Sequence, residues 1–533
     1  MDFKILIADK ISPEGLAWLE NQPGLETTFL PGQNEDQLVE AIGAFDAVIV
    51  RSATRITGRV LEAAKKLKVV GRAGIGVDNI DVSGATEKGV VVLNTPDANA
   101  TTTAELTIAH ILSLSRHLPA ADRSVREGQW ERAAFMGTEI AGKTLGVLGY
   151  GTIGRLVAAR GLALKMNVEV HDPFVTDEVV RKNGCRPVDL ATLLAGADYL
   201  TLHCPVTAGT RGIIGADQLA SMKKGARLIN CARGPLVDEA ALVAALESGQ
   251  LSGAALDVYA KEPPTGSALL NLPNAVFTPH LGASTREAQV AVGTQIARQV
   301  VQFLKTGEPV NAVNLPSVSA EQLARVRPWQ GLARALGRLL GALAERQVER
   351  IEVTLNGCPE DIDTHLVAVE AVVGFLGNQF SGPVNQVNAP TLAQRQGIKL
   401  VEARSDQVSD YRTRLDVAVS GGGESIQVSG TLFDEQYPRL VRIDDFDIEA
   451  VLEGDLLLTR HEDRSGVAAD FCRVIADAGI NITRLHLGPV GQEGRAMAVV
   501  GLENSLPSDA LEKIRALPAL EMVHQLFCES CGP

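Results

Sequence analysis

A glycine-rich turn followed by an acidic residue is the first feature of this sequence that predicts chemistry. Residues 149–154 read Gly-Tyr-Gly-Thr-Ile-Gly, between an apolar run at 144–148 and a helix-like stretch at 155–165. Asp172 ends a second apolar run, eighteen residues after Gly154. In such a turn the glycines allow a sharp bend, close approach of a pyrophosphate, and packing of the helix on the strand. The helix N-terminus offers free N–H groups to phosphates, and the acid can bind a ribose 2′-hydroxyl but repels a 2′-phosphate. The pattern predicts a site for NAD rather than NADP.

Three residues beyond this turn, Arg233, Glu262 and His280, are the candidates for catalysis, because each follows a strand-like run. Ligands of open α/β sheets bind outside the carboxyl ends of the strands. Hydride transfer from an alcohol carbon needs a base for the hydroxyl proton, and the imidazole of His280 suits this near neutral pH. Glu262 can hold the other ring nitrogen, and Arg233 can bind the carboxylate of a 2-hydroxy or 2-oxo acid through two parallel hydrogen bonds. Taken singly, they could be a surface salt bridge, a solvated loop acid and a helix cap. Together, after a nucleotide-binding pattern, they favour catalysis.

The elements that must position these groups alternate between strand-like and helix-like stretches. Long helices are expected at 101–118 and 285–304, on either side of the segment with the glycine-rich turn. We therefore expect an α/β core of two lobes with a cleft between them. A flavodoxin-like substrate-binding lobe would comprise residues 1–97 plus 285–313, with an NAD-binding Rossmann domain inserted at 98–284. Parallel strands are expected at 4–8, 47–50, 68–71 and 90–93 in the first lobe, and at 144–148, 167–171, 199–203, 227–230, 253–257 and 276–278 in the second.

Two further domains are expected after a linker rich in Pro, Asn and Ser at 308–319. Residues 320–450 should form an α+β intervening domain with an amphipathic helix at 329–345. The three glycines at 421–423 separate two alternating runs, which predicts a β-hairpin. Residues 455–528 follow the order βαββαβ of a ferredoxin-like fold.

Composition excludes several classes of function. The chain has 533 residues, 45% of them hydrophobic, and a net charge of −14, which argues against nucleic-acid binding. No apolar run approaches the ~20 residues of a membrane span, and no signal peptide is visible. Seven scattered cysteines fit a reducing, cytoplasmic location. Cys528 and Cys531 form a C-x-x-C pair, which without a second pair predicts incidental thiols rather than a metal site. We expect no metal.

The sequence resembles the D-isomer-specific 2-hydroxyacid dehydrogenases over essentially its full length. The resemblance is with long members that carry an intervening domain and a C-terminal ACT domain, a regulatory module for small ligands. It implies NAD-dependent oxidation of 3-phospho-D-glycerate to 3-phosphohydroxypyruvate, the first step towards serine, by a homo-oligomer, expected to be a tetramer, with L-serine as effector. The motifs that carry it are GRAGIGVDNID (71–81), NTPDANATTTAE (94–105), WERAAFMGTEIAGKTLGVLGYGTIG (130–154), INCARGPLVDE (229–239), ALDVYAKEPP (255–264) and TPHLGASTREAQ (278–289).

The resemblance also implies roles for individual residues. Arg233, Glu262 and His280 would form the catalytic triad. Ile75 departs from some relatives, which carry Thr there, so only a backbone contact is expected from it. Phosphate binding needs cations beyond Arg233, with Arg51 as one and Arg72 or Arg132 as another. The implied cofactor contacts are Ile75, Gly149, Gly151, Thr152, Ile153, Gly154, Asp172, Cys204, Cys231, Ala232, Arg233, Asp257, His280, Gly282 and Ala283. The implied substrate contacts are Arg51, Ser52, Gly74 and Asn99, and the implied effector site is Asp463, Gly466 and Asn481.

Two alternatives stay open from the sequence. One is a 2-hydroxyacid dehydrogenase for glyoxylate, hydroxypyruvate or 2-oxoglutarate, against which the long C-terminal part argues. The other is a non-catalytic, NAD-sensing interaction protein on the same fold, against which the intact triad argues.

Overall fold

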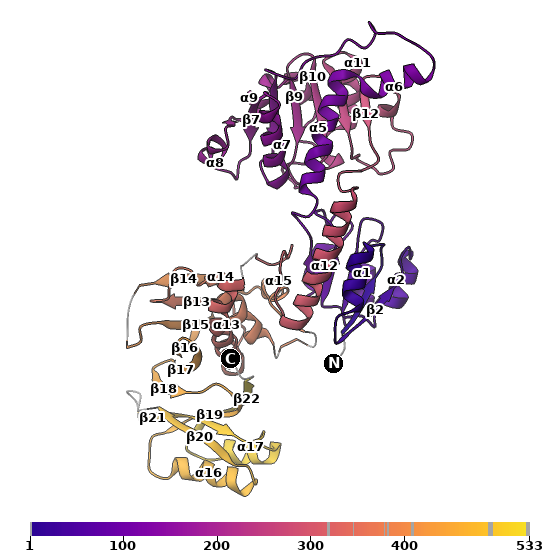
Figure 1. The fold of residues 1–533 in the computed structure, drawn as a ribbon. Helices are drawn as coiled ribbons and strands as arrows, with labels where there is room; N and C mark the ends of the chain where they lie inside the picture. The colour runs from indigo at the N-terminus through magenta and orange to yellow at the C-terminus, as the bar shows by residue number, and fades with distance from the viewer. Residues whose placement is uncertain are drawn as a thin grey trace.

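The computed structural model describes residues 3–316, 320–344, 346–377, 379–380, 383–406, 410–488 and 494–528. The structure has four parts, each built on one sheet. In space they run from the seven-stranded sheet at the top of Figure 1, through the five-stranded and six-stranded sheets, to the C-terminal four-stranded sheet at the bottom. None of the helices in these ranges has the length and apolar character needed to cross a membrane. Cys528 is buried at the end of the last strand, whereas Cys531 lies outside the described residues.

The first lobe is a five-stranded parallel sheet in the order β2-β1-β3-β4-β5. This 2-1-3-4-5 order confirms the flavodoxin-like prediction. The strand β2 was not predicted, because its sequence LETTF mixes polar and apolar residues at an exposed sheet edge. Helices α1 and α12 cover one face, and α2, α3 and α4 cover the other. The bounds are β1 Phe3–Ile7, α1 Pro13–Glu20, β2 Leu25–Phe29, α2 Glu35–Ile42, β3 Ala47–Val50, α3 Gly58–Ala63, β4 Val69–Arg72, α4 Val82–Glu87, β5 Val91–Leu93 and α12 Arg286–Thr306.

The second lobe is a seven-stranded parallel sheet in the order β12-β11-β10-β9-β6-β7-β8. Counted from β6, this is the 3-2-1-4-5-6 order of a Rossmann fold with one strand added, so the predicted class is confirmed. The order reverses between β6 and β9, where such sheets bind ligands. Helices α5 and α7 pack on one face, and α9, α10 and α11 on the other. The bounds are α5 Ala100–Arg116, α6 Leu118–Arg126, β6 Thr144–Leu148, α7 Thr152–Ala163, β7 Asn167–His171, α8 Asp177–Lys182, β8 Arg186–Pro187, α9 Leu190–Gly196, β9 Tyr199–Leu202, α10 Ala216–Ser221, β10 Ala226–Asn230, α11 Glu239–Glu247, β11 Leu251–Leu256 and β12 Ala275–Phe277.

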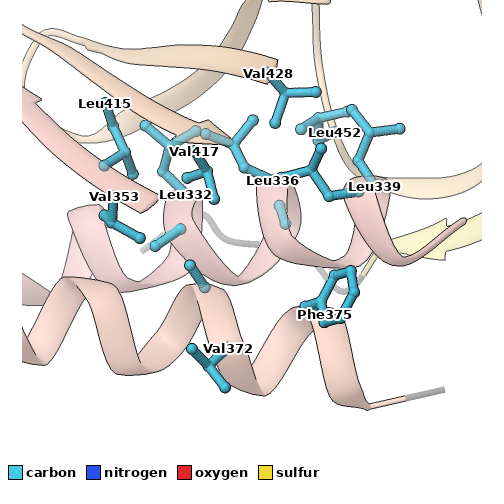
Figure 2. Packing of buried hydrophobic residues seen from close by; sticks show 14 of the residues in the cluster. Leu332, Leu336, Leu339, Val353, Val372, Phe375, Leu415, Val417, Val428 and Leu452 are labelled. Atoms are coloured by element: carbon cyan, nitrogen blue, oxygen red, sulfur yellow. The ribbon is translucent and has the colours of Figure 1, made fainter. Parts of the chain in front are cut away.

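The intervening domain packs helices α13 and α14 against a six-stranded mixed sheet, as Figure 2 shows for Leu332, Leu336 and Phe375. The helix predicted at 329–345 begins earlier, at Ala320, and ends at Leu343, because Pro328 lies within the helix instead of preceding it. The predicted hairpin forms, with positive φ angles at Gly422 and Gly423 between β15 and β16. The bounds are α13 Ala320–Leu343, β13 Arg350–Asn356, α14 Thr364–Leu376, α15 Ala389–Arg395, β14 Lys399–Ser405, β15 Arg414–Gly421, β16 Glu424–Phe433, β17 Tyr437–Ile443 and β18 Phe446–Ala450.

The C-terminal domain has the predicted βαββαβ order and a sheet ordered β20-β21-β19-β22. Its helices cover one face of the sheet. The other face contributes Leu456, Leu458 and Leu526 to the same buried cluster as the intervening domain. These two domains therefore share one continuous core. The bounds are β19 Gly454–Glu462, α16 Val467–Asp477, β20 Ile482–Gly488, β21 Arg495–Leu502, α17 Ser508–Arg515 and β22 Leu520–Cys528.

The intervening domain also contacts the first lobe directly. The side-chain amide of Asn385 donates to the Gly89 carbonyl at 2.8 Å, and Val387 joins the buried cluster under α12. Arg395 forms an ion pair with Glu87 at the end of α4. The intervening domain is thus attached to the first lobe.

Candidate active site

A cleft of about 830 Å³ lies between the two lobes and is lined by residues of both. Its walls come from the ends of parallel strands, as expected for ligand sites of open α/β sheets. The predicted site residues that line it are Arg51, Ser52, Ile75, Asn99, Cys231, Arg233, Glu262, His280, Gly282 and Ala283. Distant parts of the chain therefore meet in one cleft.

His280 and Glu262 form a hydrogen-bonded pair at the cleft wall. The Nδ1 of His280 lies 2.7 Å from Glu262 Oε2, and Glu262 Oε1 accepts from the backbone N–H of Tyr259 at 3.2 Å. Burial alone would raise the pKa of Glu262, but the hydrogen bond and charge of His280 outweigh it, so its pKa is lowered. The carboxylate therefore stays ionised near neutral pH, and the His280 Nε2 is left to face a ligand.

Asp257 fixes the loop on both sides of His280 from a fully buried position. One carboxylate oxygen accepts from the Thr278 hydroxyl at 2.6 Å and the Leu281 N–H at 2.7 Å, and the other accepts from the Gly282 N–H at 2.8 Å. Because the Thr278 hydroxyl donates to Asp257, it accepts from His110 Nε2, 3.1 Å away. Burial lowers the pKa of His110, which is therefore neutral. Asp257, predicted as a cofactor contact, supports the loop that carries His280.

Arg233 is held at two of its nitrogens. Its Nε donates to Asp78 Oδ2 at 3.0 Å, and its Nη1 donates to the Ala232 carbonyl at 2.7 Å. The buried Asn230 fixes the backbone of this turn, since its side chain donates to the Arg233 carbonyl and accepts from the Ala232 N–H. A guanidinium has five donors, so three remain for a carboxylate.

Arg51, Arg72 and Arg233 gather in the cleft. Burial and the positive charges of Arg233 and Arg51 lower the pKa of Arg72 to about 10. The buried Nε of Arg72 has no hydrogen-bond partner in the described part of the chain. Arg72 lines the cleft together with Arg51, whereas Arg132 lies on an exposed segment outside the cleft lining. The cleft has an excess of positive charge suited to an anionic ligand.

Each of the three glycines in the turn after β6 is required for a different structural reason. Gly149 has φ +95°, and a Cβ there would lie 2.7 Å from the backbone of His203 and Cys204. A Cβ at Gly154 would lie 2.1 Å from the Gly149 carbonyl oxygen, whereas one at Gly151 would meet no described atom within 4 Å. The open side of Gly151 is where a pyrophosphate can approach.

Asp172 lies beside this turn, at the end of β7. Its carboxylate accepts from the Tyr150 N–H at 2.7 Å and from the Phe174 N–H at 2.9 Å. The acid is therefore fixed next to the N-terminus of α7, where the ribose of a dinucleotide would be bound. Thr152 begins α7, and its hydroxyl lies 3.3 Å from Asp97.

The remaining predicted residues are placed as follows. Gly74 has φ +144°, a backbone conformation that L residues with a side chain rarely adopt, so this position requires glycine, and a Cβ there would also displace the end of the Arg72 side chain. Ile153 is partly buried against the core under α7. Burial raises the pKa of the Cys204 thiol and raises that of Cys231 to about 12, so both thiols are neutral. Asn99 is buried at the start of α5.

The predicted effector residues lie in the C-terminal domain. Gly466, with φ +99°, precedes α16, and Asp463 lies in the exposed turn that leads to it. Asn481 is exposed just before β20, and its carbonyl accepts from the Glu503 N–H.

Three residues that support the arginines were not predicted from the sequence. They are Asp9, Asp78 and Asn79, and the last two lie inside a motif already quoted. Their side chains reach Arg51, Thr54 and Arg233 from other elements, a relationship that spacing along the chain does not reveal.

Comparison with known domain families covers most of the chain in three segments. Residues 108–282 match the NAD binding domain of D-isomer specific 2-hydroxyacid dehydrogenases. Residues 325–444 match the intervening domain of D-3-phosphoglycerate dehydrogenase, and residues 456–519 match the ACT domain.

Curated relatives match over nearly the whole length. D-3-phosphoglycerate dehydrogenase of Bacillus subtilis (strain 168) is 37% identical over 98% of this chain and 99% of its own. The enzyme of that name from Archaeoglobus fulgidus is 39% identical over 97% and 98%. Among solved structures, the TT0316 protein of Thermus thermophilus is 34% identical, with a TM-score of 0.54 over 58% of this chain and 99% of its own. A glyoxylate reductase from Paecilomyes thermophila is 32% identical, with a TM-score of 0.55 over 58% and 98%. The chain therefore belongs to the D-3-phosphoglycerate dehydrogenase family, within the D-isomer specific 2-hydroxyacid dehydrogenases, in a long form with an intervening domain and an ACT domain.

Proposed function

We propose that the protein uses NAD to oxidise 3-phospho-D-glycerate to 3-phosphohydroxypyruvate, the first step of phosphorylated serine synthesis. The observation that carries this proposal is the excess of positive charge in the cleft, where Arg51 and Arg72 accompany Arg233. A substrate with both a carboxylate and a phosphate would neutralise this charge. The names of the full-length relatives support the same substrate.

Each residue then has a chemical task. The open side of Gly151 and the N-terminus of α7 fit the pyrophosphate of NAD, and Asp172 fits its ribose. When bound, NAD supplies the acceptor for the hydride. Arg233 orients the substrate carboxylate, and the His280 Nε2 takes the hydroxyl proton. Glu262 stabilises the imidazolium that forms, because its carboxylate already meets Nδ1.

Each predicted domain is assigned a role in this function. We assign 1–97 plus 285–313 to substrate binding, 98–284 to NAD, 320–450 to the intervening domain and 455–528 to the ACT domain. Hydrogen bonds support the second segment of the first lobe, since the Val313 N–H donates to the Val92 carbonyl at 2.7 Å and the Asn94 N–H donates to the Asn311 carbonyl at 3.2 Å.

Regulation and assembly form a further part of the proposal. We propose L-serine as the effector, with Asp463 and Asn481 binding its ammonium group and the N-terminus of α16 its carboxylate. We also propose a homotetramer in the cytoplasm. Exposed apolar side chains on and after α6, those of Leu118, Val125, Trp130 and Met136, support an interface on the NAD-binding domain.

Each of the two alternative functions leaves a feature of the cleft unexplained. A dehydrogenase for glyoxylate, hydroxypyruvate or 2-oxoglutarate has no use for a phosphate-binding arginine pair. A non-catalytic NAD sensor has no use for the His280–Glu262 hydrogen bond. The test is NADH-dependent reduction of 3-phosphohydroxypyruvate beside hydroxypyruvate, glyoxylate and 2-oxoglutarate. We expect the phosphorylated acid to have the highest kcat/KM. A preference for an unphosphorylated acid supports the first alternative, and no turnover of any acid supports the second.

A further inference from the structure

We propose that Asp78 and Asn79 are positioning residues for two different arginines: Asp78 orients Arg233 for the carboxylate of any substrate acid, whereas Asn79 holds the turn at 51–54, whose Arg51 selects the phosphate. The inference rests on the proposed function, because it concerns how the same cleft selects phosphorylated acids. Both residues line the cleft on the loop after β4. Asp78 contacts the side chain of Arg233, and Asn79 contacts the backbone of Arg51.

Asp78 holds Arg233 across the cleft. Its carboxylate, in the first lobe, accepts from Arg233 Nε at 3.0 Å, while Arg233 belongs to the Rossmann domain. The bond to Asp78 and the bond from Nη1 to the Ala232 carbonyl use two of the five donors. Both hydrogens of Nη2 and one of Nη1 remain, which suffices for two parallel bonds to a carboxylate. The Asp78 side chain is 71% exposed and that of Arg233 is 27% exposed, and an ion pair with one partner largely in solvent contributes little to stability. Its effect is therefore on the orientation of the guanidinium.

Asn79 holds the turn that carries Arg51. Its side-chain amide donates to the carbonyls of Arg51 and Thr54, both at 2.6 Å. From the other side, Asp9 accepts from the backbone N–H groups of Arg51 and Thr54 at 2.5 and 3.1 Å. Backbone donors and backbone acceptors of the same turn are thus bound by two different side chains. Asp9 is only 5% exposed, so the turn is anchored to the sheet.

The two contacts are made by consecutive residues, whose Cα atoms are separated by one peptide, about 3.8 Å. The backbone of this loop is fixed as well, since the Ile56 N–H donates to the Asn79 carbonyl at 2.9 Å and the Asp81 N–H donates to the Ile56 carbonyl at 2.8 Å. One fixed loop therefore positions both arginines, Arg233 through Asp78 and the Arg51 turn through Asn79. Because both acids use Arg233 but only the phosphorylated acid uses Arg51, only the Asn79 contact should affect the preference for phosphorylated acids.

The Asp78 and Asn79 contacts predict different losses of kcat/KM when each is removed. Asn79→Ala releases only the Arg51 turn, so kcat/KM for 3-phosphohydroxypyruvate should fall about tenfold to a hundredfold, while that for hydroxypyruvate changes less than about twofold. Asp78→Ala releases Arg233, which both acids use, so both values should fall about tenfold or more and their ratio should stay near that of the wild type. Asp78→Asn keeps an oxygen that can accept from Nε and should restore most of the activity.

The experiment measures both acids on each preparation of the full-length protein with NADH. The ratio of the two kcat/KM values does not depend on the folded fraction, so a partly unfolded variant still gives an answer. Asp81→Asn is the matched control, because Asp81 lies in the same loop and caps α4 through the Gly84 N–H without contacting either arginine. It should leave both values unchanged.

The outcomes separate this inference from the proposed function. If the wild type does not reduce 3-phosphohydroxypyruvate, the proposed function fails. If the wild type does so, but Asn79→Ala lowers kcat/KM for both acids equally or for neither, the role of Asn79 in phosphate selection is wrong. If Asp78→Ala changes the ratio, or Asp78→Asn is no better than Asp78→Ala, the orienting role of Asp78 is wrong.

Discussion

The imidazole of His280 and the carboxylate of Glu262 are joined by a 2.7 Å hydrogen bond, although they lie on loops that follow different strands. Glu262 follows β11 and His280 follows β12, and these strands are parallel neighbours in the sheet. Their carboxyl ends meet at one edge, so residues 18 positions apart in the chain become partners. Asp257, buried below them, fixes the loop of His280 from both sides.

Replacing Glu262 with Gln should shift the pH dependence of oxidation. The pKa of Glu262 is lowered, so its carboxylate is charged across the neutral range and stabilises protonated His280. Oxidation needs the neutral imidazole as base. Without the negative charge the proton leaves His280 more easily, so the acidic limb of kcat should move to lower pH, with a lower maximal rate. The profile of kcat against pH checks this. An unchanged limb would mean that the pair does not act as one unit.

Replacing Arg233 with Lys should lower kcat/KM by about tenfold or more, although the charge is kept. Lysine cannot present two parallel donors to a planar carboxylate, and it cannot also donate to Asp78 from a separate nitrogen. Steady-state kinetics with 3-phosphohydroxypyruvate measures the loss, and the NAD dissociation constant of the variant serves as control. Near-normal efficiency in the Lys variant would remove Arg233 from its role.

Alanine at Gly149 and alanine at Gly151 should have opposite consequences. Gly149→Ala forces a Cβ against His203 and Cys204 at a positive φ. The melting temperature should therefore fall, and the free energy of unfolding should decrease by roughly 1–3 kcal/mol. Gly151→Ala meets open space, so the fold should keep its melting temperature while NAD binds at least about tenfold more weakly. Calorimetry and NAD titration on the two variants make the comparison. Equal melting temperatures, or normal NAD binding by Gly151→Ala, would contradict the assignment of the turn.

Much of this arrangement could be predicted from the sequence because local patterns encode it. Apolar runs predict the parallel strands, and the glycine spacing predicts the turn around Gly149. The strand β2 could not be found this way, because it is a partly polar edge strand without an apolar run. The start of α13 was missed because a proline such as Pro328 usually marks the end or the beginning of a helix. The contacts of Asp78 and Asn79 depend on how two lobes meet, which no local pattern carries.

L-serine should inhibit the enzyme through the C-terminal domain. The turn at Asp463 meets the N-terminus of α16, a favourable place for a carboxylate. Binding there can affect the first lobe, because the C-terminal sheet shares a core with the intervening domain, and that domain contacts Gly89. Asp463→Ala and Asn481→Ala should each weaken serine inhibition while leaving uninhibited kcat unchanged.

The matched control for serine is Asp509→Ala, an acid in the first turn of the other helix, α17, which should keep normal inhibition. Coupling must be reciprocal, so saturating substrate and NAD should weaken serine binding. If serine does not inhibit the wild type, or inhibits Asp463→Ala equally well, the effector site is wrong.

The most direct measurement is NADH formation by the full-length protein from 3-phospho-D-glycerate and NAD, beside D-glycerate, which lacks only the phosphate. We expect turnover of 3-phospho-D-glycerate with a kcat/KM at least about a hundredfold above that of D-glycerate, because D-glycerate would leave Arg51 and Arg72 unpaired. We also expect His280→Ala to lower kcat by about two to four orders of magnitude while NAD still binds. No NADH from 3-phospho-D-glycerate, equal rates with the two acids, or an active His280→Ala variant would contradict the proposed function.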